Sequence, residues 1–155
     1  MNFLGKPIDQ PVDKEWKLQA YIVQEARRAG YFITGSMEQG KRSKATAGIA
    51  KATGMTAGVP DVHLWLPEGR HAFVELKLVP GGKVSPAQRD FHAAVTKLGH
   101  VVYLLWASTP KEAWEKMMDI IQIASQPGMP TEQQVPEPQF PEPQVPRSMV
   151  FYEPR

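Results

Sequence analysis

The amino-acid sequence predicts a small α/β sandwich in which helices pack on a mixed sheet. Three observations support this fold class: a β-hairpin pattern over residues 62–78, a strong helix-start signal at Ser85, and an apolar strand over residues 100–106. A strand, a helix and a second strand in this order imply a right-handed crossover. The strands over residues 71–78 and 100–106 should therefore run parallel to each other.

The first helix is expected over residues 14–29, with Asp13 as its cap and Gly30 as its end. Its apolar residues recur at helical spacing and form one core-facing stripe, which consists of Leu18, Ile22, Val23 and Ala26. A short strand over residues 31–34 follows this helix. A helix-like linker then leads to the hairpin.

The two hairpin strands differ in pattern. Residues 62–66 form an apolar run between two prolines, which is typical of a buried strand. Residues 71–78 instead alternate, so that Phe73, Glu75 and Lys77 share the face opposite the apolar residues. Apolar runs flank this second strand, which predicts a central position in the sheet. Charges on a central strand are costly unless they are paired or bind a metal.

Two later helices carry start signals. Ser85 is a candidate N-cap, Pro86 fits the first helical position, and Gln88 completes a capping box. Thr109 repeats this capping logic at the start of a last helix. Gly99 is expected to end the first of these helices. Each helix should have an apolar stripe, which consists of Phe91, Val95 and Leu98 on the first and of Trp114, Met117, Met118 and Ile121 on the second.

The chain of 155 residues allows one core domain, expected over residues 1–125, and a tail over residues 126–155. Eight of the 15 prolines lie in the tail. Proline at this density prevents helices and sheet ladders, so the tail is predicted to be extended and largely disordered. A solvated tail without a partner is the simpler interpretation. The alternative is a docking peptide for a protein partner, with Phe151 and Tyr152 as its anchors.

Composition narrows the range of functions. The chain has no cysteine, which excludes disulfides, thiolate zinc sites and cysteine nucleophiles and fits a reducing cytoplasm. No apolar run approaches the roughly 18 residues of a membrane span, so no membrane partner is expected. Residues 1–125 carry 16 Lys and Arg against 12 Asp and Glu, a net charge of +4, whereas the tail has a net charge of −2. The modest positive charge of the core suits an anionic partner.

Asp61 and Glu75 are the leading candidates for metal ligands, and Lys77 accompanies them. Asp61 precedes the first hairpin strand, whereas Glu75 and Lys77 lie about 7 Å apart on one face of the second. Hard cations such as Mg²⁺ take one or two carboxylates together with water and substrate phosphate. This set therefore predicts a metal-dependent phosphodiesterase site. The alternative is that Asp61 caps a turn and the other two form an exposed pair on an edge strand.

The motif Pro60-Asp61 with Glu75-Leu76-Lys77 resembles that of the PD-(D/E)xK nuclease superfamily. The longer pattern adds Gly58-Val59 and Ser85-Pro86-x-Gln88, and it is similar to the virus-type replication-repair nuclease family, VRR-NUC. The resemblance covers about residues 15–113. It implies a restriction-endonuclease-like αβββαβα core and hydrolysis of branched or flapped DNA with Mg²⁺ or Mn²⁺, often by a homodimer. For a phage-encoded member, it implies action in the host-cell cytoplasm.

The resemblance also assigns roles to single residues. Asp61 and Glu75 become metal ligands together with the backbone carbonyl of Leu76. Lys77 becomes the catalytic lysine, which either stabilises charge on the phosphate or holds the attacking water.

Three further positions match the family. Gln88 corresponds to a glutamine that faces the site in relatives and counts as catalytic. Glu15 and Gln19 correspond to a carboxylate and a glutamine on the first helix, so Glu15 is a further metal and catalytic candidate and Gln19 a candidate DNA contact. The alternative for Glu15 is a first-turn carboxylate that the helix dipole favours.

A cluster of cations precedes the first hairpin strand and resembles a basic loop of this family. Clustered cations with glycine suit contacts to DNA phosphates, although a solvated loop is the alternative. The candidate DNA-binding residues are Lys41, Arg42, Lys44, Lys51 and Lys83. The four histidines show no paired ligand spacing, so zinc is not expected. The tryptophans Trp65, Trp106 and Trp114 are predicted to pack in the core.

The preferred hypothesis is a structure-selective DNA endonuclease that depends on a divalent metal. A restriction-type enzyme or an exonuclease on the same fold is the nearest alternative. A second class of function is a DNA-binding scaffold that uses an inactive nuclease fold and recruits partners through its tail. The intact set of Asp61, Glu75 and Lys77 argues against inactivity.

Overall fold

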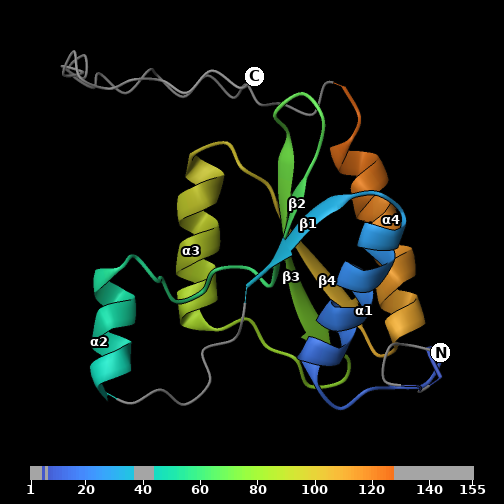
Figure 1. The fold of residues 1–155 in the computed structure, drawn as a ribbon, viewed down its shortest axis with the longest axis horizontal. Helices are drawn as coiled ribbons and strands as arrows, with labels where there is room; N and C mark the ends of the chain where they lie inside the picture. The colour runs from blue at the N-terminus through green and yellow to red at the C-terminus, as the bar shows by residue number, and fades with distance from the viewer. Residues whose placement is uncertain (1–4, 6, 37–43, 128–155) are drawn as a thin grey trace, which may run out of the picture.

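One four-stranded mixed sheet organises residues 5, 7–36 and 44–127, which are those that this computed structural model describes. The elements are α1 (Glu15–Arg28), β1 (Phe32–Gly35), α2 (Lys44–Ala52), β2 (Val62–Trp65), β3 (His71–Leu78), α3 (Pro86–Lys97), β4 (Val102–Ala107) and α4 (Pro110–Ala124). They confirm the expected αβββαβα core, with α2 as the predicted helix-like linker (Figure 1). No helix in this described part is long and apolar enough to cross a membrane.

The strand order is β1-β2-β3-β4, which makes β3 an interior strand as predicted. β1, β2 and β3 pair antiparallel, whereas β3 and β4 pair parallel through the crossover helix α3. Val62 lies opposite Val74 in the β2–β3 register. Extending that register by one residue places Asp61 opposite Glu75, so the sheet itself brings the two carboxylates together.

The hydrophobic core lies between the sheet and the two helices α1 and α4, which cover the same face (Figure 1). The helical spacing of apolar residues predicted this contact on both helices. The core residues include Leu18, Ile22 and Ala26 of α1, Met117 and Ile121 of α4, and Val62, Leu64, Val74, Leu76 and Leu105 of the sheet. The alternating pattern of β3 therefore leaves Phe73, Glu75 and Lys77 on the opposite face.

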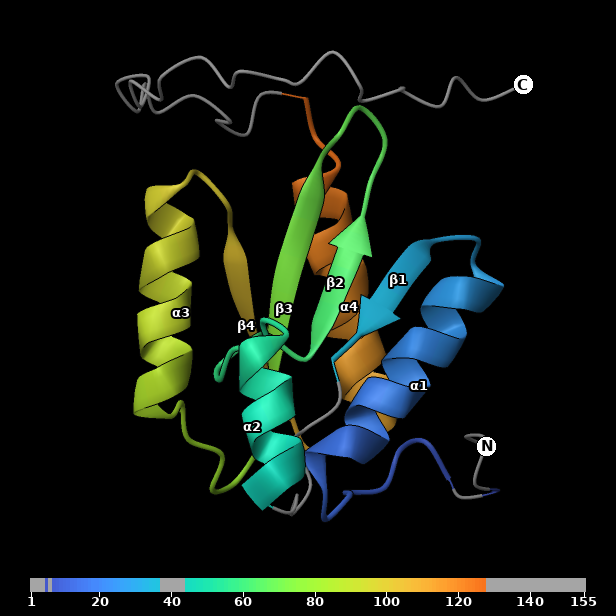
Figure 2. The ribbon, with the colours of Figure 1, turned by 60° about the vertical axis from the view of Figure 1, so that its left-hand side comes forward.

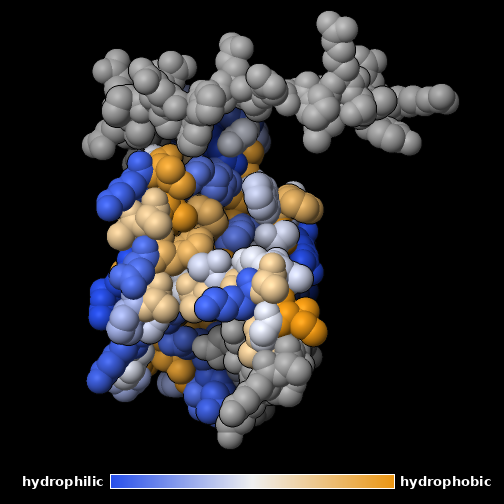
Figure 3. All heavy atoms as spheres, turned by 90° about the vertical axis from the view of Figure 1, so that its left-hand side faces the viewer, coloured by the Kyte–Doolittle hydropathy of each residue, from blue (hydrophilic) through white to orange (hydrophobic). Residues whose placement is uncertain are grey.

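Helix α3 stands on that opposite face beside β4, and α2 lies near the lower end of the sheet (Figure 2). The prediction that α3 has a core stripe is wrong, because no residue of this described helix is buried and Leu98 is 70% exposed. The helix contacts the sheet through Phe91, whose ring meets that of Phe73 edge to face at 6.2 Å. Hydrophilic and apolar side chains accordingly alternate over the side formed by α3 and α2 (Figure 3).

The tryptophans on the same face also depart from expectation. Trp65 and Trp106 were predicted to be core residues, yet they are 46% and 37% exposed. Both lie on the sheet face away from α1 and α4, which the apolar runs of β2 and β4 did not indicate. Trp114 of α4 does pack against the core as predicted.

Two of the three predicted helix caps are confirmed. The Ser85 side chain accepts a hydrogen bond from the backbone of Gln88 in a complete capping box, and Thr109 caps α4. The third prediction is wrong, because α1 begins at Glu15 and places Lys14, not Asp13, at the N-cap. Asp13 instead pairs with Lys17 one helical turn away.

We propose that residues 1–125 form the folding domain, because α4 completes the core. Truncation after Ser125 should therefore shift the melting temperature by no more than about 2 °C, since the segment that is removed has too little apolar content to pack. The predicted tail lies almost wholly outside the described residues. Calorimetry of the full and truncated chains checks this, and a loss of 5 °C or more would contradict the domain boundary.

Candidate active site

A sharp turn at Gly58 leads the chain into the site. Its φ of 85° is a left-handed conformation that favours glycine. A Cβ atom at this position would lie 2.2 Å from the carbonyl oxygen of Ala87, at the start of α3. The loop before β2 is thus packed directly against the N-terminus of α3. This close approach explains why the motif begins with glycine and brings Asp61 beside β3.

Asp61 is held through both its side chain and its backbone. Its Oδ2 accepts a hydrogen bond from the backbone N–H of Leu76 at 2.7 Å. Its carbonyl oxygen accepts from the Gln19 side chain at 2.9 Å and from the N–H of Ser36 at 2.8 Å. These contacts connect α1, the end of β1 and β3 at one point.

Glu75 is fully buried on the central strand. Its Oε1 accepts hydrogen bonds from Lys77 Nζ at 2.7 Å and from the Gln88 side chain. Its Oε2 has no hydrogen-bond partner among the described residues. His92 Nε2 lies 3.7 Å from Oε2 and is likewise buried without a hydrogen-bond partner there. Burial and the charge of Lys77 lower the pKa of His92, which favours a neutral ring. One oxygen of this carboxylate is therefore free to take a ligand.

Glu15 brings a third carboxylate to the site from the first turn of α1. Its Oε2 lies 3.5 Å from Lys77 Nζ, and its Oε1 accepts from the backbone N–H of Leu78 at 3.3 Å. Lys77 thus lies between two carboxylates, Glu15 and Glu75. This position fits both interpretations of Glu15, as a metal ligand and as a carboxylate that the helix dipole favours, because a carboxylate in the first turn of α1 also reaches the site.

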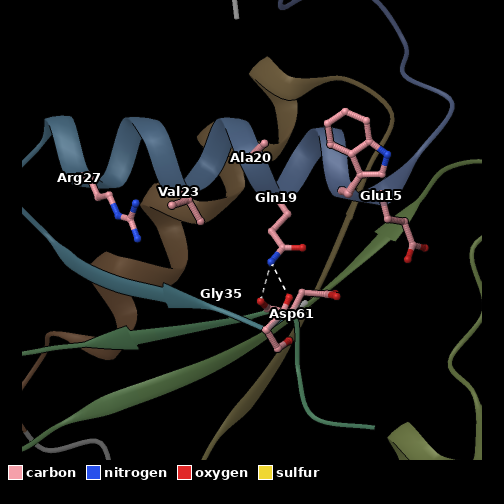
Figure 4. Close-up of a pocket in the computed structure, with 9 residues that line it drawn as sticks. Glu15, Gln19, Ala20, Val23, Arg27, Gly35 and Asp61 are labelled. Carbon is pink, nitrogen blue, oxygen red and sulfur yellow. Dashed lines mark hydrogen bonds between the residues drawn. The ribbon is translucent and has the colours of Figure 1, made fainter. Parts of the chain in front are cut away.

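The side chains of Gln19 and Gln88 connect helices to the segments that carry Asp61 and Glu75, and we call them braces. The Gln88 side chain accepts from the backbone N–H of Ser85 at 2.8 Å within the capping box, and the same amide donates to Glu75. Gln19 donates to the carbonyl oxygens of Ser36 and Asp61, both at 2.9 Å (Figure 4). Each amide therefore links a helix to the strand segment that carries a carboxylate.

Electrostatics at the site favour an additional cation. Burial, and then the charge of Glu75, raise the pKa of Asp61 to about 7. Burial also raises the pKa of Glu75. Burial works against the charge of Lys77, but its hydrogen bond to Glu75 and the surrounding carboxylates outweigh this and raise its pKa. The carboxylates together carry more negative charge than one ammonium group balances.

The donor set fits a hard divalent cation. The available ligands are carboxylate and carbonyl oxygens, which Mg²⁺ and Mn²⁺ prefer. The Oε2 of Glu75, which is buried without a hydrogen-bond partner in the described part of the chain, would fit such an ion. Within the described ranges, no three His, Cys, Asp or Glu side chains form a metal site by themselves. Water and substrate phosphate would therefore complete the coordination.

A groove runs from this cluster along α1. It has a volume of about 490 Å³ and lies between α1 and the ends of β1 and β2 (Figure 4). Glu15, Gln19 and Asp61 line one end, and Arg27 lines the other. The Arg27 guanidinium, which donates to the carbonyl oxygen of Ile33 at 3.5 Å, therefore places one cation at the far end of the groove.

Most of the predicted site residues lie together in the structure. These are Glu15, Gln19, Asp61, Glu75, Leu76, Lys77 and Gln88. The predicted DNA contacts are dispersed: Lys51 is exposed near the end of α2, and Lys83 is exposed in the loop before α3. Lys41 and Arg42 lie outside the described residues, as does the side chain of Lys44.

His92 is the site residue that the sequence analysis did not identify. It lies four residues after Gln88, so both side chains project from the same side of α3 toward Glu75. The four-residue spacing from Gln88 was the feature of the sequence that could have identified His92 as a site residue. A search for histidine pairs could not find it, because its neighbours in the site are not histidines.

The sequence is similar to one family of known proteins. The family model of the VRR-NUC domain matches residues 8–108. The chain is 33% identical over 92 residues to p44, a candidate nuclease of Acyrthosiphon pisum secondary endosymbiont phage 1. This similarity covers 59% of the present chain and 82% of the phage protein.

Two solved structures are also similar. A VRR-NUC domain protein aligns with a TM-score of 0.51 and 17% identity, over 74% of this chain and 93% of that one. A VRR-NUC domain aligns with a TM-score of 0.46 and 23% identity, over 70% of this chain and 97% of that one. The first of these supports the same fold.

The raised pKa of Asp61 predicts how stability depends on pH without metal. A carboxyl group whose pKa is raised by folding stabilises the folded state most at low pH, and this contribution is lost as the pH rises to the folded-state pKa. In EDTA, the wild-type melting temperature should therefore fall between about pH 4 and pH 7. Asp61→Asn should show a smaller fall. Melting curves at pH 5 and pH 8 check this, and an identical fall in both proteins would refute the link to Asp61.

Proposed function

Because this chain belongs to the VRR-NUC domain family and is a nuclease that acts on DNA, we propose that it is a structure-selective endonuclease that requires a divalent metal. It hydrolyses phosphodiester bonds in branched or flapped DNA. The observation that carries the proposal is the cluster formed by the half-buried Asp61 and the buried Glu75 and Lys77, on and beside a central strand. Similarity to a phage protein supports the host-cell cytoplasm as its place of action.

Nucleases of this family use divalent metals, and we assign Mg²⁺ or Mn²⁺ to Asp61 and Glu75. Glu15 and the carbonyl oxygen of Leu76 are further ligand candidates. When bound, such an ion would act as a Lewis acid on the scissile phosphate and make a water molecule more acidic. The free Oε2 of Glu75 supports this assignment.

Lys77 acts as a cation, not as a base. Its raised pKa keeps it protonated at neutral pH, and it is anchored by Glu75 and Glu15. In hydrolysis, the oxygen of water bonds to phosphorus and one P–O ester bond breaks. Negative charge grows on the phosphate oxygens during this step, and an ammonium group held in place stabilises it. Of the two roles left open for Lys77, we therefore propose the stabilisation of charge on the phosphate.

Cleavage assays on different DNA substrates distinguish this proposal from an exonuclease and from a DNA-binding scaffold. Purified protein should cut fork, flap or four-way-junction DNA with Mg²⁺ or Mn²⁺, but not with EDTA, and should cut linear duplex more slowly. Degradation from free ends without branch preference would favour an exonuclease. Binding without cleavage in either metal would favour the scaffold function.

We also propose that the protein acts as a homodimer. Leu104 and Trp106 are exposed on the edge strand β4 and lie opposite Glu75 and Lys77 in the register. A second copy on this side would cover these apolar residues and place two sites near each other, as a symmetric junction requires. Light scattering tests this: the full chain and the chain ending at Ser125 should both have the mass of a dimer.

Removal of either central carboxylate should abolish cleavage. Asp61→Ala and Glu75→Ala each remove a metal ligand, which is worth several kcal/mol of transition-state stabilisation, or roughly 10³-fold or more in rate. The matched control is Glu25→Ala on α1, whose carboxylate pairs with Arg28 away from the site. Cleavage of a flap substrate is the measurement, with circular dichroism to confirm folding. Full activity in either site variant would overturn the assignment.

Lys77 and the basic loop should have separable effects. Lys77→Ala should lower turnover by roughly 10²–10³-fold and leave DNA affinity nearly unchanged, because its role lies in the transition state. Lys41→Ala with Arg42→Ala should instead weaken binding to all DNA sequences and flatten its salt dependence. Single-turnover kinetics and binding titrations distinguish the two. If both variants lost affinity alone, the proposed division would be wrong.

A further inference from the structure

A row of rings crosses the sheet face that carries Glu75 and Lys77. The register places Phe32 opposite Trp65 and Trp65 opposite His71, so the row spans β1, β2 and β3. Residues directly opposite each other in antiparallel strands project from the same face. We call Phe32, Trp65 and His71 the ring row.

Two rings of the ring row are exposed, and its central ring is fixed. Phe32 is 68% and Trp65 46% exposed. The Trp65 ring stacks on His71, with centroids 5.6 Å apart and planes inclined by 24°. Its Nε1 also donates to Thr34 Oγ1 at 3.1 Å. A large ring that is already held in place loses little conformational freedom when a ligand stacks on it.

The ring row is continuous with the active site. His71 contacts Phe73 at a centroid distance of 4.9 Å, and Phe73 lies two residues before Glu75 on the same face of β3. Four residues along a strand span about 14 Å, which is a few nucleotides. Phe32 begins β1 and Trp65 ends β2. Among the described elements, no helix lies over these ends of the two strands on the face where α3 stands (Figure 2).

The chemistry of the ring row suits nucleobases. Stacking on aromatic rings binds single strands without regard to sequence, because every base has a π-face. Burial and the neighbouring His100 lower the pKa of His71, so this ring is neutral at pH 7 and supports the Trp65 ring that stacks on it. The carboxylate of Glu68 in the adjacent turn is paired with Arg70.

We propose that the ring row is a stacking platform for the bases of a single-stranded DNA arm that leads away from the active site. The proposal rests on the proposed function, because it assumes that the scissile DNA phosphate lies beside Lys77. It gives a structural basis for preference for flaps and forks over linear duplex.

The test is a comparison of two flap substrates that differ in one arm. One carries a single-stranded arm of thymidines, and the other carries abasic residues at the same positions. Binding is measured by fluorescence anisotropy in EDTA, with the full chain as wild type, Trp65→Ala, Trp65→Phe and Met118→Ala. Met118 is the matched control, because it is a comparably exposed apolar residue on α4, across the sheet.

Trp65→Ala should weaken binding to the thymidine arm by about 5- to 100-fold and leave binding to the abasic arm unchanged. Trp65→Phe should lie between it and wild type, and Met118→Ala should equal wild type. Equal effects of Trp65→Ala on both arms, or no effect on either, would overturn the platform. A change in mass by light scattering without a change in DNA binding would also overturn it, and would assign the ring row to contact between copies.

The experiments distinguish failure of the stacking platform from failure of the proposed nuclease function. Binding in EDTA requires no cleavage, so a stacking effect without nuclease activity on flaps would contradict the enzyme assignment alone. Metal-dependent flap cleavage by wild type together with normal binding by Trp65→Ala would contradict the platform alone.

Discussion

The burial of Glu75 on an interior strand is the constraint on which the site depends. An ionised carboxylate without water is strongly unfavourable unless other groups compensate for it. Lys77 and Gln88 both bind Oε1, and Oε2 has no partner among the described residues. The fold therefore holds a carboxylate that is only half compensated. A divalent cation is the simplest group that would complete it.

The surrounding structure serves to hold this carboxylate and its neighbours in place. Gly58 allows the loop before Asp61 to approach the start of α3, and Gln88 joins the cap of α3 to Glu75. Gln19 performs the same function from α1 through the carbonyl oxygen of Asp61. Because each brace is part of a helix or a turn, the site is built on rigid elements. Such support is what positions catalytic groups to within a fraction of an ångström.

The sequence predicted the part of the molecule in which local chemistry and periodicity agree. The alternation of β3, the capping box at Ser85 and the spacing of Leu18 and Ile22 each have one interpretation, and the structure agrees with all of them. The motif residues could be predicted as a set, because a carboxylate and a lysine on a central strand and a carboxylate beside it need one another.

The errors arose where sequence cannot reveal which face is covered. Leu98 and Trp65 occupy positions with the period of a core residue, but α3 stands beside β4 and does not cover the whole sheet. Apolar periodicity shows that residues share one face of a helix or strand, but it does not show whether another element packs on that face. The role of His92 depends on its distance from Glu75, which only the packing of α3 determines.

The most direct test of the metal assignment is the anomalous diffraction of crystals that contain Mn²⁺. The account predicts an anomalous peak within coordination distance of both Asp61 and Glu75, with Oε2 of Glu75 as a ligand. The same crystals of Glu75→Gln should lose the peak. A peak located elsewhere, or none between these two carboxylates at saturating Mn²⁺, would contradict the claim that this pair of carboxylates is the metal centre.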